Sequence, residues 1–440
     1  MKGYYLIETY GCEMNKAESN ALAYELNQLG YLPTTQAGEA DWIIINTCSV
    51  RQSAEDRVWG RLGYFKALKK DSNLKIALMG CMAEHLKNDE KLFKIFNVDE
   101  VIGNFDKKNF IAKLAKDKEQ GARNKEQISE LGNYFTGNDE YSFFSRHQAN
   151  GLKAHIPIMH GCNNFCSYCI VPYLRGREIS RPPAEIIGEI TAQLVAGVKE
   201  IVLIGQNVNS YNTVLNFPQL LKEISTAVSG NFRLRFTSSH PKDFSRQLVE
   251  VMAGDSRFAP QLHLAAQHGS DKVLAEMNRG YTAAAYLDLL KMAREIIPNI
   301  EITTDLLIGF PGETAEDFKL LLQFIKEAGF NDGFTYKYND RAGTAASKRS
   351  DKVADEVAAS RLSEVITLQR AISAERLKRR IGQTVTVLVQ HQAKRTDDLF
   401  GYNEYNENVV FKADNSLVGQ FVSVRVKSVS GLTLQGIVEK

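Results

Sequence analysis

The sequence predicts a multidomain α/β protein: an N-terminal parallel α/β domain, a partial (β/α)6 barrel and a small C-terminal antiparallel β-barrel. A chain of 440 residues is too long for one ordinary core, so several domains are expected. Strand-like and helix-like segments alternate along most of the chain, and beyond Ile381 they become short and strand-like. We expect one domain at residues 2–118, a linker at 119–147, and two further domains at 148–378 and 380–440.

The N-terminal domain shows a β-α-β-α-β pattern. Apolar runs at residues 4–10, 41–47 and 75–80 predict strands, and helical patterns lie between them. We expect the first helix to begin with Asn15 as its N-cap and to stop at Gly30, and the second to span residues 53–69.

The predicted linker belongs to a polar stretch with little periodicity, from about Lys116 to Asn150. It carries five aromatic residues, which suggest that part of it docks on a neighbouring domain: Tyr134, Phe135, Tyr141, Phe143 and Phe144.

The central region repeats a βα pattern six times. Six units are too few for the usual eight-stranded barrel, so we predict an open, partial barrel with its active site at the C-terminal strand ends. The helical stretches fall at 183–196, 217–228, 244–252, 283–296 and 315–328. The strand candidates are 155–160, 201–204, 233–237, 261–264, 301–308 and 333–338.

Several predicted strand ends carry residues suited to holding a cofactor. Ordinary βα turns use the same residue types, so each position alone is ambiguous. Their shared place on one rim favours a functional role, and glycine there lets backbone approach a ligand closely. The candidates are Gly205, Gln206, Asn207, Ser238, Gln267 and Gly309.

After the barrel, a charged helix is predicted over residues 353–380, and we interpret its basic end as solvated. The strand pattern from Ile381 onward predicts a small β-barrel of a kind that often binds RNA. This segment has six Lys or Arg residues and six Asp or Glu residues, so its architecture suggests RNA binding more than its charge does.

Three cysteines, Cys162, Cys166 and Cys169, lie within eight residues, just after the first barrel strand. Thiolates favour iron–sulfur clusters or zinc. Three ligands would leave one iron of a cluster open to a reacting molecule, whereas structural zinc needs a fourth ligand, which His160 could supply. Both metals are compatible with this spacing.

The remaining cysteines, Cys12, Cys48 and Cys81, each follow a predicted N-terminal strand almost at once. Buried Cys commonly serves as a small apolar core residue. However, parallel strands place their C-terminal ends on one sheet edge, where α/β folds bind ligands. We therefore expect these three thiols to converge as a second three-cysteine cluster.

The overall composition excludes a polybasic protein, because the net charge is +2 and 24% of residues are charged. Any nucleic-acid binding must then be local. The sequence shows no signal-peptide core and no apolar run long enough to span a membrane, so a cytoplasmic protein with no membrane partner is expected.

The spacing Cys162-x3-Cys166-x2-Cys169 resembles the signature of radical S-adenosylmethionine (SAM) enzymes. The sequence around these cysteines closely resembles that of the methylthiotransferase family. With the second cysteine set and the C-terminal barrel, the resemblance covers nearly the whole chain. The supporting segments are residues 169–173, 175–178, 180–181 and 205–208.

This resemblance implies a radical SAM methylthiotransferase with two 4Fe-4S clusters, SAM and an RNA-binding TRAM domain. Cys162, Cys166 and Cys169 would hold the cluster that binds SAM, and the other cysteine set the cluster that supplies the sulfur. The implied reaction adds a methylthio group to carbon 2 of N6-dimethylallyladenosine at position 37, next to the anticodon, in the anticodon stem-loop of tRNA. A second SAM methylates the sulfur. A monomer served by an electron-donor protein is expected, and the sulfur donor is unknown.

Three places depart from the family pattern. His268 stands where a serine is usual, Leu174 where a threonine is usual, and Gln390-His391 where a glutamate–glycine pair is usual. The first two bear on contacts around the predicted ligands, although no cluster ligand is lost.

The sequence is also compatible with other functions. Sister enzymes modify threonylcarbamoyladenosine in tRNA or an aspartate of a ribosomal protein, and residues 206–211 favour the dimethylallyl substrate. A non-catalytic, zinc-stabilised RNA-binding protein is the alternative from a different class.

Overall fold

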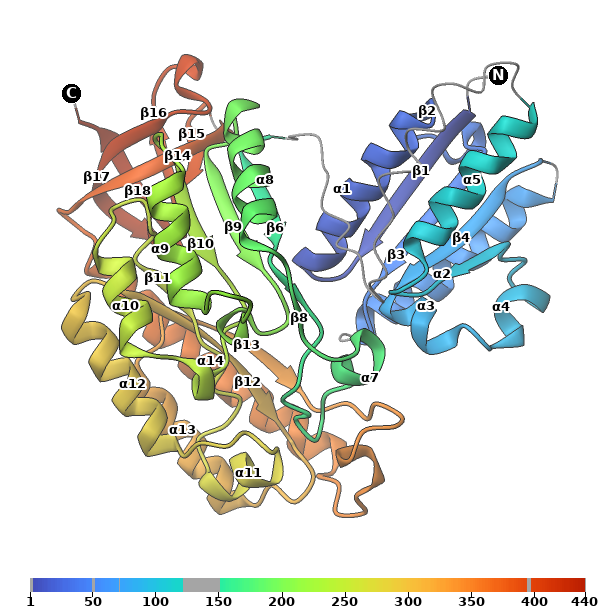
Figure 1. Cartoon of the computed structure of the whole chain (residues 1–440). Coiled ribbons are helices and arrows are strands. Elements are labelled where there is room, and N and C mark those ends of the chain that lie inside the picture. Colours follow the sequence, from blue (N-terminus) through green and yellow to red (C-terminus); the bar gives the residue numbers. More distant parts are fainter. Residues whose placement is uncertain (1–2, 50–51, 71, 122–150, 394–396, 440) are drawn as a thin grey trace. The chain divides into compact units, whose positions relative to one another are not determined.

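The computed structural model describes residues 3–49, 52–70, 72–121, 151–393 and 397–439 (Figure 1). The chain forms two compact units. The first comprises residues 1–148, 155–163 and 170–181, and the second comprises residues 149–154, 164–169 and 182–440. Most of the predicted linker, from residue 122 onward, lies outside the described residues, as do its five aromatic residues.

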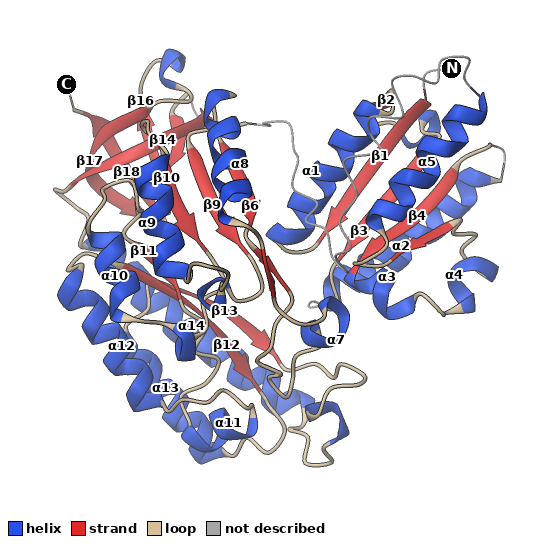
Figure 2. Ribbon diagram, in the orientation of Figure 1, coloured by secondary structure: helices blue, strands red, loops and turns tan. Residues whose placement is uncertain are grey.

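The first unit is built on a five-stranded sheet of order β2-β1-β3-β4-β5, in which every pair is parallel (Figure 2). Crossover helices join the strands, as parallel pairing requires. The strands are β1 (Gly3–Tyr10), β2 (Tyr31–Pro33), β3 (Trp42–Thr47), β4 (Lys75–Gly80) and β5 (Glu100–Ile102). The helices are α1 (Glu13–Gln28), α2 (Gln52–Lys69), α3 (Cys81–Leu86), α4 (Glu90–Lys94) and α5 (Lys107–Gly121).

Both faces of this sheet are buried. In β3, Trp42 and Ile44 join a core cluster with residues of α1 and α5, while Ile43 and Ile45 join one with residues of α2. This two-sided burial explains why β3 reads as a continuous apolar run rather than an alternating one.

The structure differs from the sequence-based expectations for this unit in three places. Helix α1 begins at Glu13 with Cys12 as its N-cap, so Asn15 lies inside the helix and is not its N-cap. Asn15 is fully buried, and its side chain donates to the side chain of Asn46 at 2.9 Å. The short strands β2 and β5 were not predicted. Helix α5 runs to Gly121, so the expected linker start at residue 119 is still helical.

The second unit contains two three-stranded sheets of orders β10-β9-β6 and β11-β12-β13. The pairs β9–β10, β11–β12 and β12–β13 are parallel. Isolated bridges, Leu234 to Phe258 and Ser239 to Leu264, join them into the predicted partial barrel. Strand β6 (Lys153–Pro157) starts in this unit and passes into the first. The other strands are β9 (Glu200–Ile204), β10 (Arg233–Phe236), β11 (Gln261–His263), β12 (Glu301–Ile308) and β13 (Asp332–Lys337).

Helices follow the barrel strands on the outside (Figure 1). They bury one apolar stripe each; in α9, for example, Leu220, Leu221 and Ile224 are fully buried. The principal helices are α8 (Pro183–Val195), α9 (Phe217–Ala227), α10 (Arg246–Ala253), α11 (Asp271–Glu276), α12 (Ala283–Ile296), α13 (Ala315–Ala328) and α14 (Asp355–Lys378).

The C-terminal strands form a closed barrel of order β14-β15-β16-β18-β17. It is antiparallel as expected except for one pair, since β16 and β18 run parallel. Strand β15 was not predicted. The strands are β14 (Thr384–Gln392), β15 (Leu399–Tyr402), β16 (Asn408–Lys412), β17 (Phe421–Ser430) and β18 (Thr433–Val438).

Buried arginines of the second unit fasten this barrel to the core. Arg233 of β10 donates to the backbone oxygens of Thr386 (2.7 Å) and Asn403 (2.9 Å). Arg380, beyond the end of α14, pairs with Glu301 and with Glu407. Arg380 is 4% exposed, so the expectation of a solvated helix end was wrong for Arg380, whereas Lys378 and Arg379 are exposed as expected.

Candidate functional site

The first cysteine set lies at the C-terminal ends of parallel strands in the first unit. Cys12 follows β1, Cys48 follows β3, and Cys81 is the first residue of α3 after β4. A side chain on Gly11 would come within 2.8 Å of Cys48 Cβ, so the turn after β1 packs tightly on Cys48. A hydrogen bond with Cys48 is the main cause that lowers the pKa of Cys12 to about 6, and the charge of Arg175 contributes.

A buried ion-pair network stands beside Cys81. The Nε atom of Arg175 donates to Cys81 Sγ at 3.2 Å, and its Nη1 lies 2.9 Å from Glu18. Lys107 reaches the same carboxylate at 2.7 Å. Burial alone would raise the pKa of Glu18, but the two cations lower it to about 2. The network therefore places fixed positive charge where a thiolate would benefit from it.

The loop that carries Cys162 is fixed by its own unit. Gly161 has φ 80°, and a Cβ there would lie 2.0 Å from the backbone oxygen of Arg177, so only glycine fits. The amide of Cys162 donates to Gly176 O at 3.1 Å.

His160, considered above as a fourth zinc ligand, is fully buried beside the ring of Phe105. Burial, with the nearby charges of Arg175 and Lys107, keeps the pKa of His160 well below its ordinary value.

Cys166 and Cys169 belong to the second unit. The amide of Ser167 donates to Met277 O, and Ser167 O accepts from Ala346, so the backbone between the two cysteines is tied to the barrel. Arg279 Nη1 donates to Cys166 Sγ at 3.3 Å. A cation therefore faces a cysteine here too, as one faces Cys81 in the first set.

The donor chemistry fits iron–sulfur clusters, because each set offers three thiols and a guanidinium contacts one thiol of each. Within the part of the chain that the structure describes, no group of three His, Cys, Asp or Glu side chains could hold a metal ion as it stands. Cys12 and Cys48 are in contact, so the structure brings together a pair of the first set. The assignment of all six cysteines as ligands stays a prediction.

The predicted cofactor residues stand on the rim of the partial barrel. Gly205, Gln206 and Asn207 follow β9, Ser238 follows β10, Gln267 follows β11 and Gly309 follows β12. Ser238 and Gln267 have φ values of 65° and 68°, which side chains rarely adopt. Such backbone strain is concentrated at functional sites, so it favours a role for these two turns.

Gly309 and the unusual His268 form one buried arrangement. The amide of Gly309 donates to Glu313 Oε2 at 2.7 Å, and His268 Nε2 lies 3.4 Å from the same oxygen. His268 is fully buried, and its Nδ1 accepts from the amide of Ser270. The His268 imidazole and the Gly309 amide therefore contact the same carboxylate oxygen, which links the turn after β11 to the turn after β12.

The other departures also have structural accounts. Leu174 packs in an apolar cluster with Cys81 and Ile170. His391 stacks on Phe400 with ring centroids 5.1 Å apart.

Sequence reasoning missed Arg279 and Tyr281, which lie beside Cys166. Tyr281 accepts from Arg279 Nε at 2.9 Å and donates to Ala266 O at 2.7 Å. Its ring also packs edge-on against His240. These residues follow a short helix rather than a strand end, so the search of strand ends could not find them.

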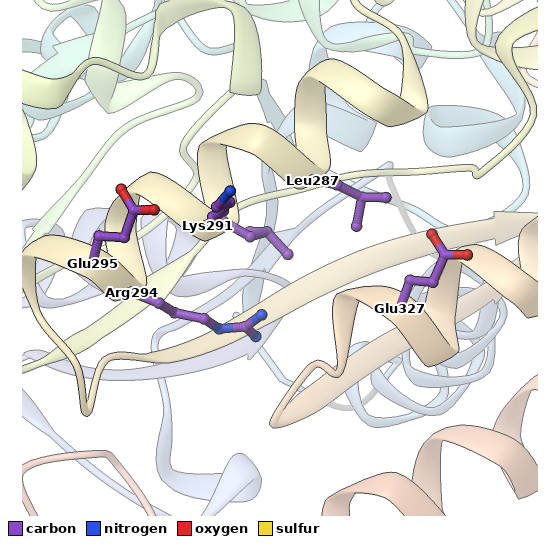
Figure 3. Close-up of a pocket in the computed structure, with 6 residues that line it drawn as sticks. Leu287, Lys291, Arg294, Glu295 and Glu327 are labelled. Carbon is purple, nitrogen blue, oxygen red and sulfur yellow. The ribbon is translucent and has the colours of Figure 1, made fainter.

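An open cavity of about 490 Å³ lies between α12 and α13 (Figure 3). Its side chains come from the outer helices and include none of the predicted site residues. Arg294 in its wall donates to Ala328 O at 2.8 Å and so serves to join the two helices. This cavity is not the functional site.

Three family models match the chain. Residues 4–103 match the uncharacterized protein family UPF0004, residues 156–325 match the Radical SAM superfamily, and residues 378–438 match the TRAM domain. The partial-barrel fold and the match to the Radical SAM superfamily thus define a radical SAM enzyme, whose cofactors are SAM and 4Fe-4S clusters.

Relatives match the chain along its whole length. The tRNA-2-methylthio-N(6)-dimethylallyladenosine synthase of Treponema denticola is 40% identical over 98% of this chain and 99% of its own. The enzyme of the same name from Bacteroides thetaiotaomicron is 42% identical over 98% of this chain and 95% of its own. The chain belongs to the family of tRNA-2-methylthio-N6-dimethylallyladenosine synthases.

A solved structure supports the fold. The radical SAM methyltransferase TsrM from Kitasatospora setae, determined with cobalamin and a [4Fe-4S] cluster bound, aligns with a TM-score of 0.59. The sequences are 15% identical, and the alignment covers 79% of this chain and 77% of TsrM.

Proposed function

We propose that this enzyme adds a methylthio group to carbon 2 of N6-dimethylallyladenosine at position 37 of tRNA. The observation that carries the proposal is the placement of Cys12, Cys48 and Cys81 at parallel strand ends, together with a second three-cysteine set, in a chain whose full-length relatives bear this activity in their names. The carbon–hydrogen bond at carbon 2 of the base is not broken by acid–base chemistry of protein side chains. The reaction therefore needs a cofactor.

Each cysteine set has its own role in this proposal. Cys162, Cys166 and Cys169 would hold the cluster that binds SAM, and Cys12, Cys48 and Cys81 the cluster that supplies the sulfur. When bound, SAM and its cluster supply the one-electron chemistry that breaks the carbon–hydrogen bond. A second SAM would supply the methyl group.

The residues of the chain position these groups. Arg175 and Arg279 would stabilise cysteine thiolates of the two sets through the hydrogen bonds described above. Gly205, Gln206, Asn207, Ser238, Gln267 and Gly309 would hold SAM on the rim.

The C-terminal barrel would bind the anticodon stem-loop. In this proposal the enzyme works as a cytoplasmic monomer with an electron-donor protein, and its functional segments are residues 2–118, 119–147, 148–378 and 380–440. No helix in the described part of the chain has the length and apolar character to cross a membrane.

Mass spectrometry of tRNA nucleosides from a strain lacking the gene tests the substrate. We expect 2-methylthio-N6-dimethylallyladenosine to disappear and N6-dimethylallyladenosine to accumulate. Persistence of the methylthio nucleoside, with loss of methylthio-threonylcarbamoyladenosine or of a modified ribosomal aspartate instead, would refute the assignment.

Two cysteine variants of the cluster-loaded enzyme test the division of roles. We expect Cys166→Ala to abolish SAM cleavage, and Cys48→Ala to retain cleavage but form no methylthio product. Chromatography measures the products of SAM cleavage and the methylthio nucleoside. Cleavage by the Cys166 variant at the wild-type rate would contradict the roles.

A further inference from the structure

The concave face of the partial barrel holds an exposed aromatic ring next to a carboxylate. Phe334 of β13 pairs in register with Asp305 of β12. Phe334 is 49% exposed, although it lies within a strand of the barrel. The reaction as derived above uses neither residue.

The direction of Phe334 follows from its neighbours. A Cβ on Gly333 would lie 3.2 Å from Gln369 of α14, and Lys337 bonds to Asp355 of α14 at 2.6 Å. Residues 333 and 337 therefore face α14. Because side chains alternate along a strand, Phe334 points to the opposite, concave face.

His263 completes this cluster from β11. Its ring packs against Phe334 with centroids 5.9 Å apart. Its Nδ1 lies 3.0 Å from Thr303 Oγ1, and its Nε2 lies 3.3 Å from Asp305 Oδ2. The imidazole thus holds the carboxylate by one oxygen, so the other oxygen, Oδ1, is available to accept a bond from a ligand.

The next layer on the same face is apolar. Leu307 and Tyr336 pair in register two residues further along the strands and belong to a core cluster with Phe310. The amide of Gln267, a predicted SAM residue, donates to Asp305 O at 2.8 Å. Next to the predicted SAM residue Gln267, this face therefore offers the hydrogen-bond acceptor Asp305 and the aromatic ring of Phe334. The apolar side chains of Leu307 and Tyr336 follow them along the strands.

We propose that Phe334, Asp305 and His263 form the site that holds the adenine base of the RNA substrate. The base stacks on Phe334, as unpaired bases stack on aromatic side chains. The N6–H of the base donates to Asp305, and the N6 substituent extends toward Leu307 and Tyr336. This inference rests on the proposed function and deepens it by naming the base-binding residues.

The same geometry accounts for substrate choice. A dimethylallyl group is uncharged and suits the apolar wall. A threonylcarbamoyl group would bring its own carboxylate close to Asp305, and like charges at short range repel. The site therefore favours the dimethylallyl nucleoside.

The test measures binding of anticodon stem-loop RNA to the cluster-loaded, full-length enzyme by fluorescence anisotropy. Three RNAs are compared, which carry N6-dimethylallyladenosine, N6-threonylcarbamoyladenosine or an abasic nucleotide at the modified position. The variants are Phe334→Leu and Asp305→Asn. Controls are Phe93→Leu on α4, which removes a similarly exposed ring, and Asp288→Asn on α12.

We expect Phe334→Leu to weaken binding of the dimethylallyl RNA about 5- to 100-fold and to leave binding of the abasic RNA unchanged. Asp305→Asn should weaken binding of the dimethylallyl RNA about tenfold. It should also reduce the ratio of the affinity for this RNA to the affinity for the threonylcarbamoyl RNA. Both controls should behave as wild type.

Wild-type affinities in both variants, or equal losses for the base-bearing and abasic RNAs, would overturn this inference and leave the proposed function intact. If the wild-type enzyme binds the dimethylallyl RNA no better than the abasic RNA and does not modify it, both proposals fail. Circular dichroism of each variant checks that its fold is retained.

Discussion

Arg279 donates a hydrogen bond from Nη1 to Cys166 Sγ at 3.3 Å, and its Nη2 donates to Ala265 O at 2.6 Å. Hydrogen bonds to cluster sulfurs help to set reduction potentials. We predict that Arg279→Met makes the potential of the Cys162, Cys166 and Cys169 cluster more negative, on the order of 50 mV. A redox titration followed by electron paramagnetic resonance measures it.

The matched control for this prediction is Arg294→Met, which removes a guanidinium bonded to Ala328 O on the outer helices. It should leave the potential unchanged. A potential in the Arg279 variant equal to that of wild type would show that this hydrogen bond does not influence the cluster.

Gln267 has a φ of 68°, a conformation that glycine adopts without strain. We predict that Gln267→Gly raises the free energy of unfolding by about 1 kcal/mol but weakens SAM binding, because the predicted contact is lost. Asn406→Gly, at φ 66° in the C-terminal barrel, should give a similar gain in stability with unchanged SAM affinity. Urea unfolding and calorimetric SAM titration separate the two effects, and unchanged SAM affinity in the Gln267 variant would remove this residue from the cofactor site.

Arg233 fixes the C-terminal barrel through three backbone oxygens, those of Thr386, Tyr402 and Asn403. Its removal also leaves Glu200 with one cation fewer. We predict that Arg233→Met lowers the free energy of unfolding by about 3–5 kcal/mol and speeds proteolysis between α14 and β14.

The control is Arg425→Met, an exposed arginine 3.4 Å from Glu439, which should cost less than about 1 kcal/mol. Equal protease sensitivity in the Arg233 variant and wild type would mean that other contacts suffice to hold the barrel.

Glu200 is buried among cations. Burial favours its protonated form, but Arg235, Lys153 and Arg233 lower the pKa of Glu200 to about 2, against an ordinary value of 4.5. Because the folded-state pKa is the lower one, its stabilising contribution is complete above about pH 4.5 and is lost as the pH falls toward 2. That contribution is on the order of 3 kcal/mol.

We predict that Glu200→Gln is less stable than wild type at neutral pH, and that the difference shrinks on acidification through this window. Urea unfolding at several pH values measures it. Glu250→Gln, at an exposed site 3.9 Å from Arg246, serves as control and should follow wild type. A stability difference that does not vary with pH would contradict the assigned ionisation.

Much of the fold could be predicted because its elements are periodic and locally bounded. Helices α12 and α13 begin and end at the predicted residues, each capped by a threonine side chain, Thr282 and Thr314. The predicted strand β4 is also correct at both ends. Local sequence carries these signals without help from distant contacts.

What sequence could not supply depends on distant partners. Asn15 reads as an N-cap, but its bonds to Asn46 place it inside α1. The basic end of α14 reads as solvated, because Glu301 and Glu407 lie far away in sequence. The short strands β2, β5 and β15 have three or four residues, too few for a periodic signal.

The candidate site was predictable to the extent that strand ends position its residues. Spacing indicated Cys162, Cys166 and Cys169, and strand ends indicated Cys12, Cys48 and Cys81. The contacts of Arg175 and Arg279 with cysteines were not predicted, because they depend on residues far away in sequence. The base site at Phe334 was hidden because an aromatic residue in a strand reads as core.

The fastening of the C-terminal barrel bears on domain exchange between relatives. Arg233 and Arg235 bind backbone oxygens, which any sequence supplies. Other contacts of the described residues need particular side chains, because Arg380 pairs with Glu407 and lies over the ring of Tyr405, and Arg233 lies over the ring of Phe421. A barrel grafted from another member of the family should therefore bind the core correctly if it keeps this glutamate and these two aromatic rings.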